Sequence, residues 1–281
     1  MGLHGKIVSL TCSMLNLIRQ VAQMRVLVSN DDGIYADGIW ILARQLSKVA
    51  QVIIVAPDRE QSAVGTAVSL RKPLRVQKII PLYPEIEAYS VEGTPSDSVI
   101  VALGKVIKEK VDLVISGINH GTNLGEDVLI SGTVGAALSA YLRNFPAIAI
   151  SSERTNTDYL DEVGRFTALL ARRIGEYRLP TNLFLNVNIP NLPLKDIKNV
   201  KITSLARKSH VNTVEEGHDG RRAYYTLMRA EVNHQADKRT DIWAINQGNI
   251  SISPLHLFLN DRFPPVVLEK MVFGLLDEFK K

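Results

Sequence analysis

The stretch RVLVSNDDGIYADG, residues 25–38, constrains the fold more than any other part of the chain. Its first five residues are mostly apolar and β-branched and lead into Asn-Asp-Asp-Gly, so they predict a short buried strand ending in a turn. Residues 39–49 then carry apolar side chains at helical spacing: Ile39, Leu42, Ala43 and Leu46. A strand, an acidic turn and a helix open an α/β domain, in which ligands bind beyond the carboxyl ends of the strands.

Two adjacent carboxylates, Asp31 and Asp32, occupy that turn. Side by side they repel each other unless a cation or a shared proton relieves the repulsion. Gly33 follows at once and allows a tight turn with room for a ligand. The alternative is an ordinary turn in which a solvated aspartate caps the next helix. The stretch alone leaves both interpretations open.

Polar loops follow two further predicted strands. Residues 51–56 (QVIIVA) form an apolar run that ends at Pro57, and the loop after it contains Ser62. That serine either contributes a hydroxyl to a site or caps a short helical turn. Residues 111–116 form the next apolar run and open into GINHGTNLG, residues 117–125. No G-x-G-x-x-G follows the first strand and no Gly-Lys-Ser/Thr is present, so neither a dinucleotide fingerprint nor a P-loop is predicted.

A helix of small residues is predicted from Ser131-Gly132-Thr133 to about Leu142. Free N–H groups at the start of such a helix bind anions, although small residues there also allow close packing against a sheet. Further helices are predicted over 97–108 and 158–177, and strands over 146–150 and 183–189. Together these elements predict an α/β fold: a Rossmann-like, doubly wound, mostly parallel sheet over residues 24–190, closed by the strand at 183–189.

The character of the chain changes after Pro190. Strand-like runs occur over 200–205, 221–232, 241–245 and 250–253, so we expect a β-rich C-terminal arm over residues 191–255. The last segment, residues 256–281, contains a predicted terminal amphipathic helix over residues 264–279. Residues 1–23 lack a clear cleavage site before Met24 and are too short and polar to span a membrane, so we treat them as an N-terminal extension.

The charge and cysteine content exclude some partners. The formal charge is +4, but Lys and Arg are scattered along the 281 residues without a dense basic run, which argues against nucleic-acid binding. A single cysteine, Cys12, excludes an internal disulfide framework and cannot alone form a zinc site. We therefore expect a cytoplasmic protein with no membrane partner.

Taken together, the motifs resemble those of one family, the SurE nucleotidases. They are Ser29–Gly33, Ala56–Arg59 with Ser62, Gly93–Asp97, Ser116–Gly125, Ser131–Ala137, Thr240-Asp241 and Ser251–Leu255. The resemblance extends over about residues 24–279. This chain departs from the family pattern at Asp37, where the family has proline, at Ala63, where it has glycine, and over 65–68, where it has a run rich in serine and asparagine.

The resemblance implies a metal-dependent phosphomonoesterase that acts on nucleoside monophosphates. Carried over residue by residue, the metal ligands are Asp31, Asp32, Ser62 and Asn119, with one divalent cation per subunit. All four side chains offer oxygen donors, which suit Mg²⁺ or Mn²⁺. We expect catalysis by Asp31, Asp32 and Asn119. The candidate phosphate-binding residues are Gly121, Asn123, Ser131, Gly132 and Thr133.

Two other classes of protein compete with this interpretation. A phosphatase of the haloacid-dehalogenase type also begins with a strand and an aspartate, but it places its acids as Asp-x-Asp rather than side by side. A non-enzymatic nucleotide-binding regulator would keep the crevice without the chemistry. The sequence leaves open the preferred nucleotide, the choice between 5′ and 3′ phosphates and the cleavage of polyphosphates.

The C-terminal region also bears on assembly. Its strand-like runs contain few apolar positions for a core of their own, and exposed strand edges invite pairing with another chain. Members of the SurE family form dimers or tetramers by exchanging C-terminal elements, so the resemblance implies a swapped homodimer or tetramer. The alternative is a hairpin that folds as a lid over the active site of a monomer.

Overall fold

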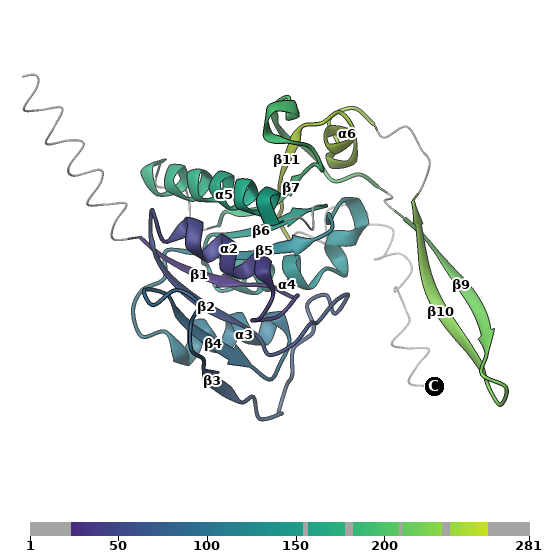
Figure 1. Ribbon diagram of the computed structural model, residues 1–281, viewed down its shortest axis with the longest axis horizontal. Coiled ribbons are helices and arrows are strands. Elements are labelled where there is room, and N and C mark those ends of the chain that lie inside the picture. Colours follow the sequence, from purple (N-terminus) through teal and green to yellow (C-terminus); the bar gives the residue numbers. More distant parts are fainter. Residues whose placement is uncertain (1–23, 154–156, 178–181, 208–209, 232–236, 258–281) are drawn as a thin grey trace, which may run out of the picture.

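One nine-stranded sheet runs through the body of the molecule (Figure 1). The structure, a computed structural model, describes residues 24–153, 157–177, 182–207, 210–231 and 237–257. The strands of this sheet are β1 (Arg25–Ser29), β2 (Gln51–Pro57), β3 (Val76–Lys78), β4 (Glu87–Val91), β5 (Leu113–His120), β6 (Ala147–Ser152), β7 (Phe184–Ile189), β8 (Val200–Ile202) and β11 (Ile250–Pro254). Their spatial order is β3-β4-β2-β1-β5-β6-β7-β11-β8.

The sheet is mostly parallel. Only the pairs β3–β4 and β7–β11 run antiparallel in it. From β1 the chain moves to β2 on one side, and it later returns to β5 on the other side of β1. The direction of winding therefore reverses between β1 and β5, and the crevice at such a switch point is where α/β sheets bind ligands. The predicted α/β, doubly wound class is confirmed.

Helices cover both faces of this sheet (Figure 1). On one face, α2 (Asp37–Leu46) and α5 (Thr157–Tyr177) pack over an apolar cluster that includes Val28, Ile115 and Ile148. On the other, α3 (Pro95–Val101) and α4 (Gly132–Tyr141) pack over a second cluster. The shorter helical turns are η1 (Ala102–Val106), η2 (Gly125–Leu129) and η3 (Leu194–Asp196).

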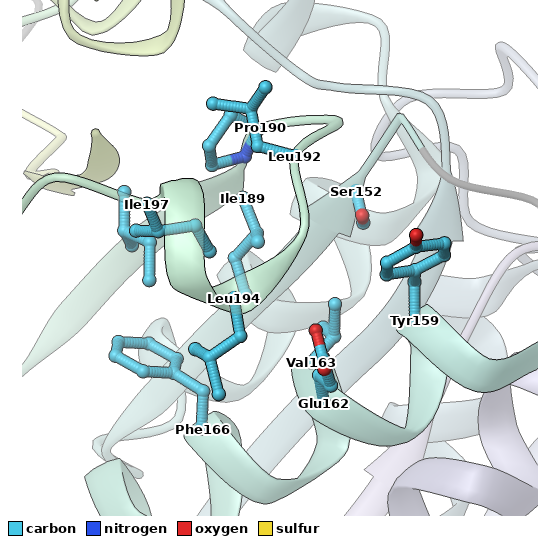
Figure 2. A pocket seen from close by; sticks show the side chains of 11 residues that line it. Ser152, Tyr159, Glu162, Val163, Phe166, Ile189, Pro190, Leu192, Leu194 and Ile197 are labelled. Atoms are coloured by element: carbon cyan, nitrogen blue, oxygen red, sulfur yellow. The ribbon is translucent and has the colours of Figure 1, made fainter. Parts of the chain in front are cut away.

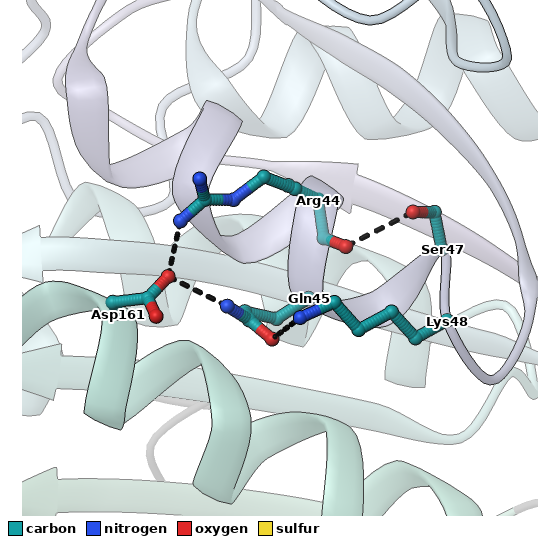
Figure 3. A network of polar contacts seen from close by, with 5 residues as sticks. All are labelled: Arg44, Gln45, Ser47, Lys48 and Asp161. Carbon is teal, nitrogen blue, oxygen red and sulfur yellow. Dashed lines mark hydrogen bonds and ion pairs between the residues drawn. The ribbon is translucent and has the colours of Figure 1, made fainter.

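Polar side chains tie α2 to α5 above the first cluster (Figure 3). Oδ1 of Asp161 on α5 forms an ion pair with Arg44 and accepts a hydrogen bond from Nε2 of Gln45 at 2.6 Å. Lys48 in turn donates to Oε1 of Gln45 at 2.6 Å. One carboxylate thus holds two neighbouring residues of α2 and fixes the two helices beside each other.

The C-terminal third differs from the prediction in two ways. The strand at 183–189 does not close the sheet, because β11 and β8 continue it beyond β7. The run at 241–245, expected as a strand, is the helix α6 (Asp241–Asn246), and Thr240 caps it by accepting the N–H of Trp243 at 3.4 Å. The β-branched and aromatic side chains of that run favoured a strand. The helix forms instead because Thr240 is a good N-cap residue.

A separate two-stranded hairpin stands away from the body (Figure 1). Its strands are β9 (His210–His218) and β10 (Ala223–Glu231). The strand predicted over 221–232 corresponds to β10. The prediction that it pairs with residues 241–245 is wrong, because its partner is β9. The strands β3, β4 and β9 were not predicted. Residues 1–23 and the terminal helix predicted over 264–279 lie outside the described residues. In the ranges that the structure describes, no helix is long and apolar enough to cross a membrane.

Candidate active site

Asp31 and Asp32 lie directly after β1, at the switch point of the sheet. Asp31 is buried, and its Oδ1 accepts a hydrogen bond from the hydroxyl of Thr133 in the first turn of α4. Neither carboxylate caps α2, because the N-cap of that helix is Ala36 and no side chain caps it. The helix-capping interpretation of the two aspartates is therefore wrong.

Burial dominates the electrostatics of both carboxylates. It raises the pKa of Asp31 to about 6, with the hydrogen bond from Thr133 acting against the rise and the charge of Asp32 adding to it. Burial also raises the pKa of Asp32, which His120 opposes through its charge and its backbone N–H. Burial thus disfavours the ionised forms of two adjacent carboxyl groups at one strand end. A bound cation would stabilise the ionised forms of both.

Ser62 and Asn119 approach the same place from two other strand ends. Ser62 lies in the loop after β2 and donates to Oε1 of Glu60 at 2.5 Å. Asn119 follows a shift in the register between β5 and β6, an irregularity of the kind that re-aims side chains beside active sites. Its amide nitrogen donates to the carbonyl of Gly121 at 2.8 Å, which leaves Oδ1 for another partner.

An open cavity of about 440 Å³ lies at this edge of the sheet. Asp31, Ser62 and Asn119 line it. Asp32 is not among the lining residues, but its Oδ2 is buried and has no hydrogen-bond partner. A buried carboxylate oxygen without a partner is costly unless a proton or a cation completes it. The residues present therefore fit a divalent cation held by Asp31, Asp32, Ser62 and Asn119.

The donor set is one of mixed oxygen ligands. Among the described residues, no three His, Cys, Asp or Glu side chains gather in a metal-binding cluster, so a cation at this site would use the hydroxyl and the amide besides the carboxylates. The described residues that line the cavity include Asp31, Asp127 and Glu153 but no Lys or Arg. An anionic substrate entering so acidic a cavity needs a counter-charge such as a metal ion.

The predicted phosphate-binding residues divide into two groups. Ser131 lines the cavity and caps α4 by accepting the N–H of Val134 at 3.1 Å. Gly132 and Thr133 are buried behind Asp31 and do not line the cavity. A Cβ added to Gly132 would lie 2.7 Å from Cβ of Asp31, so glycine is what allows α4 to approach the carboxylate.

Gly121 and Asn123 line the cavity, but their backbone amides are already bonded within the protein. The N–H of Gly121 donates to the carbonyl of Ser152 at 2.8 Å, and that of Asn123 donates to Oδ1 of Asn188 at 2.8 Å. Thr122 lies between them and also lines the cavity. The hydroxyl of Thr122 is therefore a better candidate to bind a ligand than the backbone amides of Gly121 and Asn123.

Some lining residues were not among the candidate site residues named from the sequence. They are Ala63, His120, Thr122, Asp127, Ile130 and Glu153. His120 and Thr122 stood inside the recognised loop motif, and their place in it was the available signal. Asp127 and Glu153 carried no local signal, because the fold alone brings the ends of β5 and β6 together.

A second, much smaller cavity lies on the α5 side of the same sheet edge (Figure 2). Its volume is about 30 Å³, and its walls are mostly apolar, from Val163 and Phe166 of α5 to Ile189, Leu194 and Ile197. A space of this size holds about one water molecule. This space is therefore too small for a nucleotide, whereas the cavity lined by Asp31, Ser62 and Asn119 is large enough for one.

Comparison with known proteins agrees with this geometry. Residues 26–212 match the family model described as survival protein SurE. The chain is 60% identical over 235 residues to 5′-nucleotidase SurE of Dehalococcoides mccartyi strain CBDB1, covering 83% of this chain and 89% of that protein. It is 43% identical over 239 residues to 5′-nucleotidase SurE of Moorella thermoacetica, covering 85% and 92% of the two chains.

A solved structure leads to the same family. The crystal structure of the SurE protein from Aquifex aeolicus matches with a TM-score of 0.74 and 32% identity, over 89% of this chain and 98% of that one. The family model covers more than half of the chain, and the relatives align over most of their own length. On the combined strength of its fold, its carboxylate pair and these matches, the chain belongs to the SurE family.

Proposed function

We propose that this protein is a metal-dependent 5′-nucleotidase that hydrolyses nucleoside monophosphates to nucleoside and phosphate. The observation that carries the proposal is the meeting of Asp31, Ser62 and Asn119, from three separate strand ends, around one cavity. The partnerless buried oxygen of Asp32 beside them supports it, as does the name 5′-nucleotidase SurE that the relatives bear.

The metal in this proposal is one Mg²⁺ or Mn²⁺ per subunit, held by Asp31, Asp32, Ser62 and Asn119. When bound, such a cation would act as a Lewis acid: it would neutralise charge on the phosphate and lower the pKa of a bound water molecule. Hard oxygen ligands favour these two ions over zinc. The acidic lining of the cavity supports the same requirement, because the substrate is itself an anion.

The chain's own residues divide the remaining work. Oδ1 of Asp31 is engaged by Thr133. Asp32 is therefore our candidate to take the proton of the attacking water, through the carboxylate oxygen that does not bind the cation. The hydroxyls of Thr122 and Ser131, with the imidazole of His120, line the cavity as candidate phosphate ligands. The pairing of Asp31 with Thr133 fixes the carboxylate that faces the cavity.

Release of inorganic phosphate from a panel of 5′- and 3′-nucleotides tests the function. We expect activity with Mn²⁺ or Mg²⁺, loss of activity in EDTA, and recovery when the metal is added back. The variant Asp32→Asn is expected to lose at least about a thousandfold in kcat while remaining folded. The matched control is Asp112→Asn, which makes the same change at the amino end of the sheet, where Asp112 accepts the N–H of Arg25. Near-normal turnover by Asp32→Asn would refute the assignment.

We also propose that the hairpin of β9 and β10 joins two copies of the chain in a swapped homodimer, which in turn could pair into a tetramer. Apolar side chains on it are exposed, namely Val214, Tyr224, Tyr225, Leu227 and Met228. A two-stranded hairpin is marginally stable in water without further packing. Its projection from the body in Figure 1 supports an intermolecular partner over a lid on the same subunit.

Light scattering separates these arrangements. A monomer has a mass of 31.1 kDa, so a swapped dimer is expected at about twice that value. Replacement of residues 210–231 by a short Gly-Ser linker is expected to yield a folded monomer. A native mass near that of one chain would refute the dimer. The expected cytoplasmic location, based on the single cysteine, stays a prediction.

A further inference from the structure

Two fully buried asparagines of β7, Asn186 and Asn188, lie beneath the loop that follows β5. The amide of Asn188 pairs with both main-chain groups of Asn123. Its Oδ1 accepts the N–H of Asn123 at 2.8 Å, and its Nδ2 donates to the carbonyl of Asn123 at 3.0 Å. One side chain thus bonds the loop as the backbone of a neighbouring strand would.

Two more side chains hold the same residue. Nδ2 of Asn186 donates to the carbonyl of Asn123 at 2.8 Å, and Nδ2 of Asn123 donates to the hydroxyl of Ser151 at 2.8 Å. Oδ1 of Asn186 has no partner although it is buried. An unpaired buried amide oxygen lowers stability, so packing alone does not account for an asparagine there.

Asp241 anchors the far end of the loop. It is fully buried at the start of α6, and its Oδ2 accepts the N–H of Gly125 at 2.7 Å. Its Oδ1 accepts the N–H groups of Ala206 and Ile242 at 2.9 and 2.8 Å. The N–H of Gly121 donates to the carbonyl of Ser152. The loop is therefore held by its N–H groups at every second residue: Gly121, Asn123 and Gly125.

We infer that Asn186, Asn188 and Asp241 are positioning residues for the phosphate-binding side of the active site. They line no part of the cavity, and they hold Asn123 and Gly125 so that Thr122 faces it. Gly121, whose carbonyl accepts a hydrogen bond from the amide of Asn119, is held separately by the carbonyl of Ser152. The inference rests on the proposed function, since it assigns these residues to the binding of a phosphate group. Each acts through the loop and not by contact with the substrate.

The variant Asn188→Asp tests the clamp because it keeps the size and the acceptor of the side chain. It removes the donor to the carbonyl of Asn123 and sets a negative charge against it. We expect the Michaelis constant for the nucleotide and the inhibition constant of inorganic phosphate each to rise about tenfold or more, as for other residues that orient a site from behind. Amide hydrogen exchange of peptides spanning 121–125 should accelerate at least tenfold.

A merely structural role would give a different result. Loss of folded protein lowers the apparent kcat, whereas the Michaelis and inhibition constants do not depend on how much enzyme is active. Asn249→Asp is the matched control, since Asn249 is also buried and donates to the carbonyl of Ala244, with no bond to the loop. We expect both constants to stay within twofold of native in this control.

Two outcomes separate the clamp from the proposed function. If the native protein releases no phosphate from any nucleotide, the proposed function fails, and hydrogen exchange in Asn188→Asp still tests the clamp. If the native protein is active and Asn188→Asp changes neither the two constants nor the exchange of 121–125, the clamp is refuted. Should Asn188→Asp fail to fold, Ser151→Ala replaces it, because that change removes only the bond to the side chain of Asn123. The same two readouts then decide, with a smaller rise expected.

Discussion

Thr133, in the first turn of α4, donates its hydroxyl hydrogen to Oδ1 of Asp31 at the end of β1. This bond lowers the pKa of a carboxyl that burial raises to about 6. A proton and a metal ion compete for such a group near neutral pH. The strength with which the site holds a cation is therefore coupled to a residue that does not line the cavity.

The variant Thr133→Val is expected to weaken Mn²⁺ binding in slightly acidic solution. Without the hydroxyl the pKa of Asp31 rises further. For a hydrogen bond of about 1 kcal/mol, the competing proton should increase the dissociation constant about twofold at pH 6.5 and about fivefold at pH 5. Calorimetric titration with Mn²⁺ at several pH values measures the change. At pH 8.5 Asp31 is ionised in both proteins and the difference should shrink; an undiminished difference there would contradict the proton-competition argument.

The metal-free protein should become more stable on the substitution Asp31→Asn at pH 7.5. The folded-state pKa of Asp31 is about 6, above the ordinary value of 3.8 for an aspartate, so its contribution to the free energy of unfolding falls as pH rises from about 4 through 6. At pH 7.5 this destabilisation amounts to about 1–3 kcal/mol, which the neutral amide removes. Urea unfolding in EDTA at pH 4.5 and 7.5 measures it.

The same pair of proteins supplies the control with metal present. Saturating Mn²⁺ should raise the unfolding midpoint of the native protein and leave that of Asp31→Asn nearly unchanged, since a ligand stabilises only the state that binds it. A variant that was less stable than the native protein in EDTA at pH 7.5 would show that the carboxylate of Asp31 is not destabilising when ionised.

The substitution Gly132→Ala should disturb the site from behind. The new Cβ would lie 2.7 Å from Cβ and 2.9 Å from Oδ2 of Asp31, so either the carboxylate or α4 has to move. We expect a loss of about 1–3 kcal/mol in the free energy of unfolding, and activity reduced more than tenfold. The matched control is Gly104→Ala in η1, where nothing lies within 4 Å of the added carbon. That control should be neutral or slightly stabilising.

The substitution Ala63→Gly should stabilise the loop that carries Ser62. Ala63 has a φ of 55°, in the left-handed region that costs a residue with a Cβ about 1–2 kcal/mol. Glycine removes that strain but gains freedom in the unfolded chain, so a net rise of about 0.5–1 kcal/mol is expected in denaturant unfolding. The control Ala67→Gly, outside the left-handed region, should give no such gain. Equal effects of the two substitutions would count against strain at Ala63.

The central strands and the helices that cover them could be predicted from the sequence because each is a local pattern. The strands β1, β2, β5, β6 and β7 are mostly apolar, as expected for parallel strands that are covered on both faces of a sheet. By contrast, all three residues of β3 are exposed, and the side chains of β4 alternate in burial. Short strands such as β3, at the edge of the sheet, and β4, next to it, owe their form to neighbours that the local sequence does not identify.

The site was only partly visible in the sequence for the same reason. Asp31, Ser62 and Asn119 each follow an apolar run, so their convergence could be predicted from strand ends that meet at one edge. The bonds of Asn123 with Asn188 and of Gly125 with Asp241 join residues 65 and 116 positions apart. Within their own segments, Asn188 looks like a polar residue of a strand, and Asp241 was placed in a strand that is in fact a helix.

The place of β8 in the sheet also has a consequence for biosynthesis. This strand pairs with β11, and Val200 lies opposite Ile250, which a ribosome adds 50 residues later. Until then β7 lacks β11 along one edge, and β8 has no place to dock. The sheet can therefore be completed only when nearly the whole described chain has emerged from the exit tunnel, so a nascent chain halted before residue 250 lacks two strands rather than one.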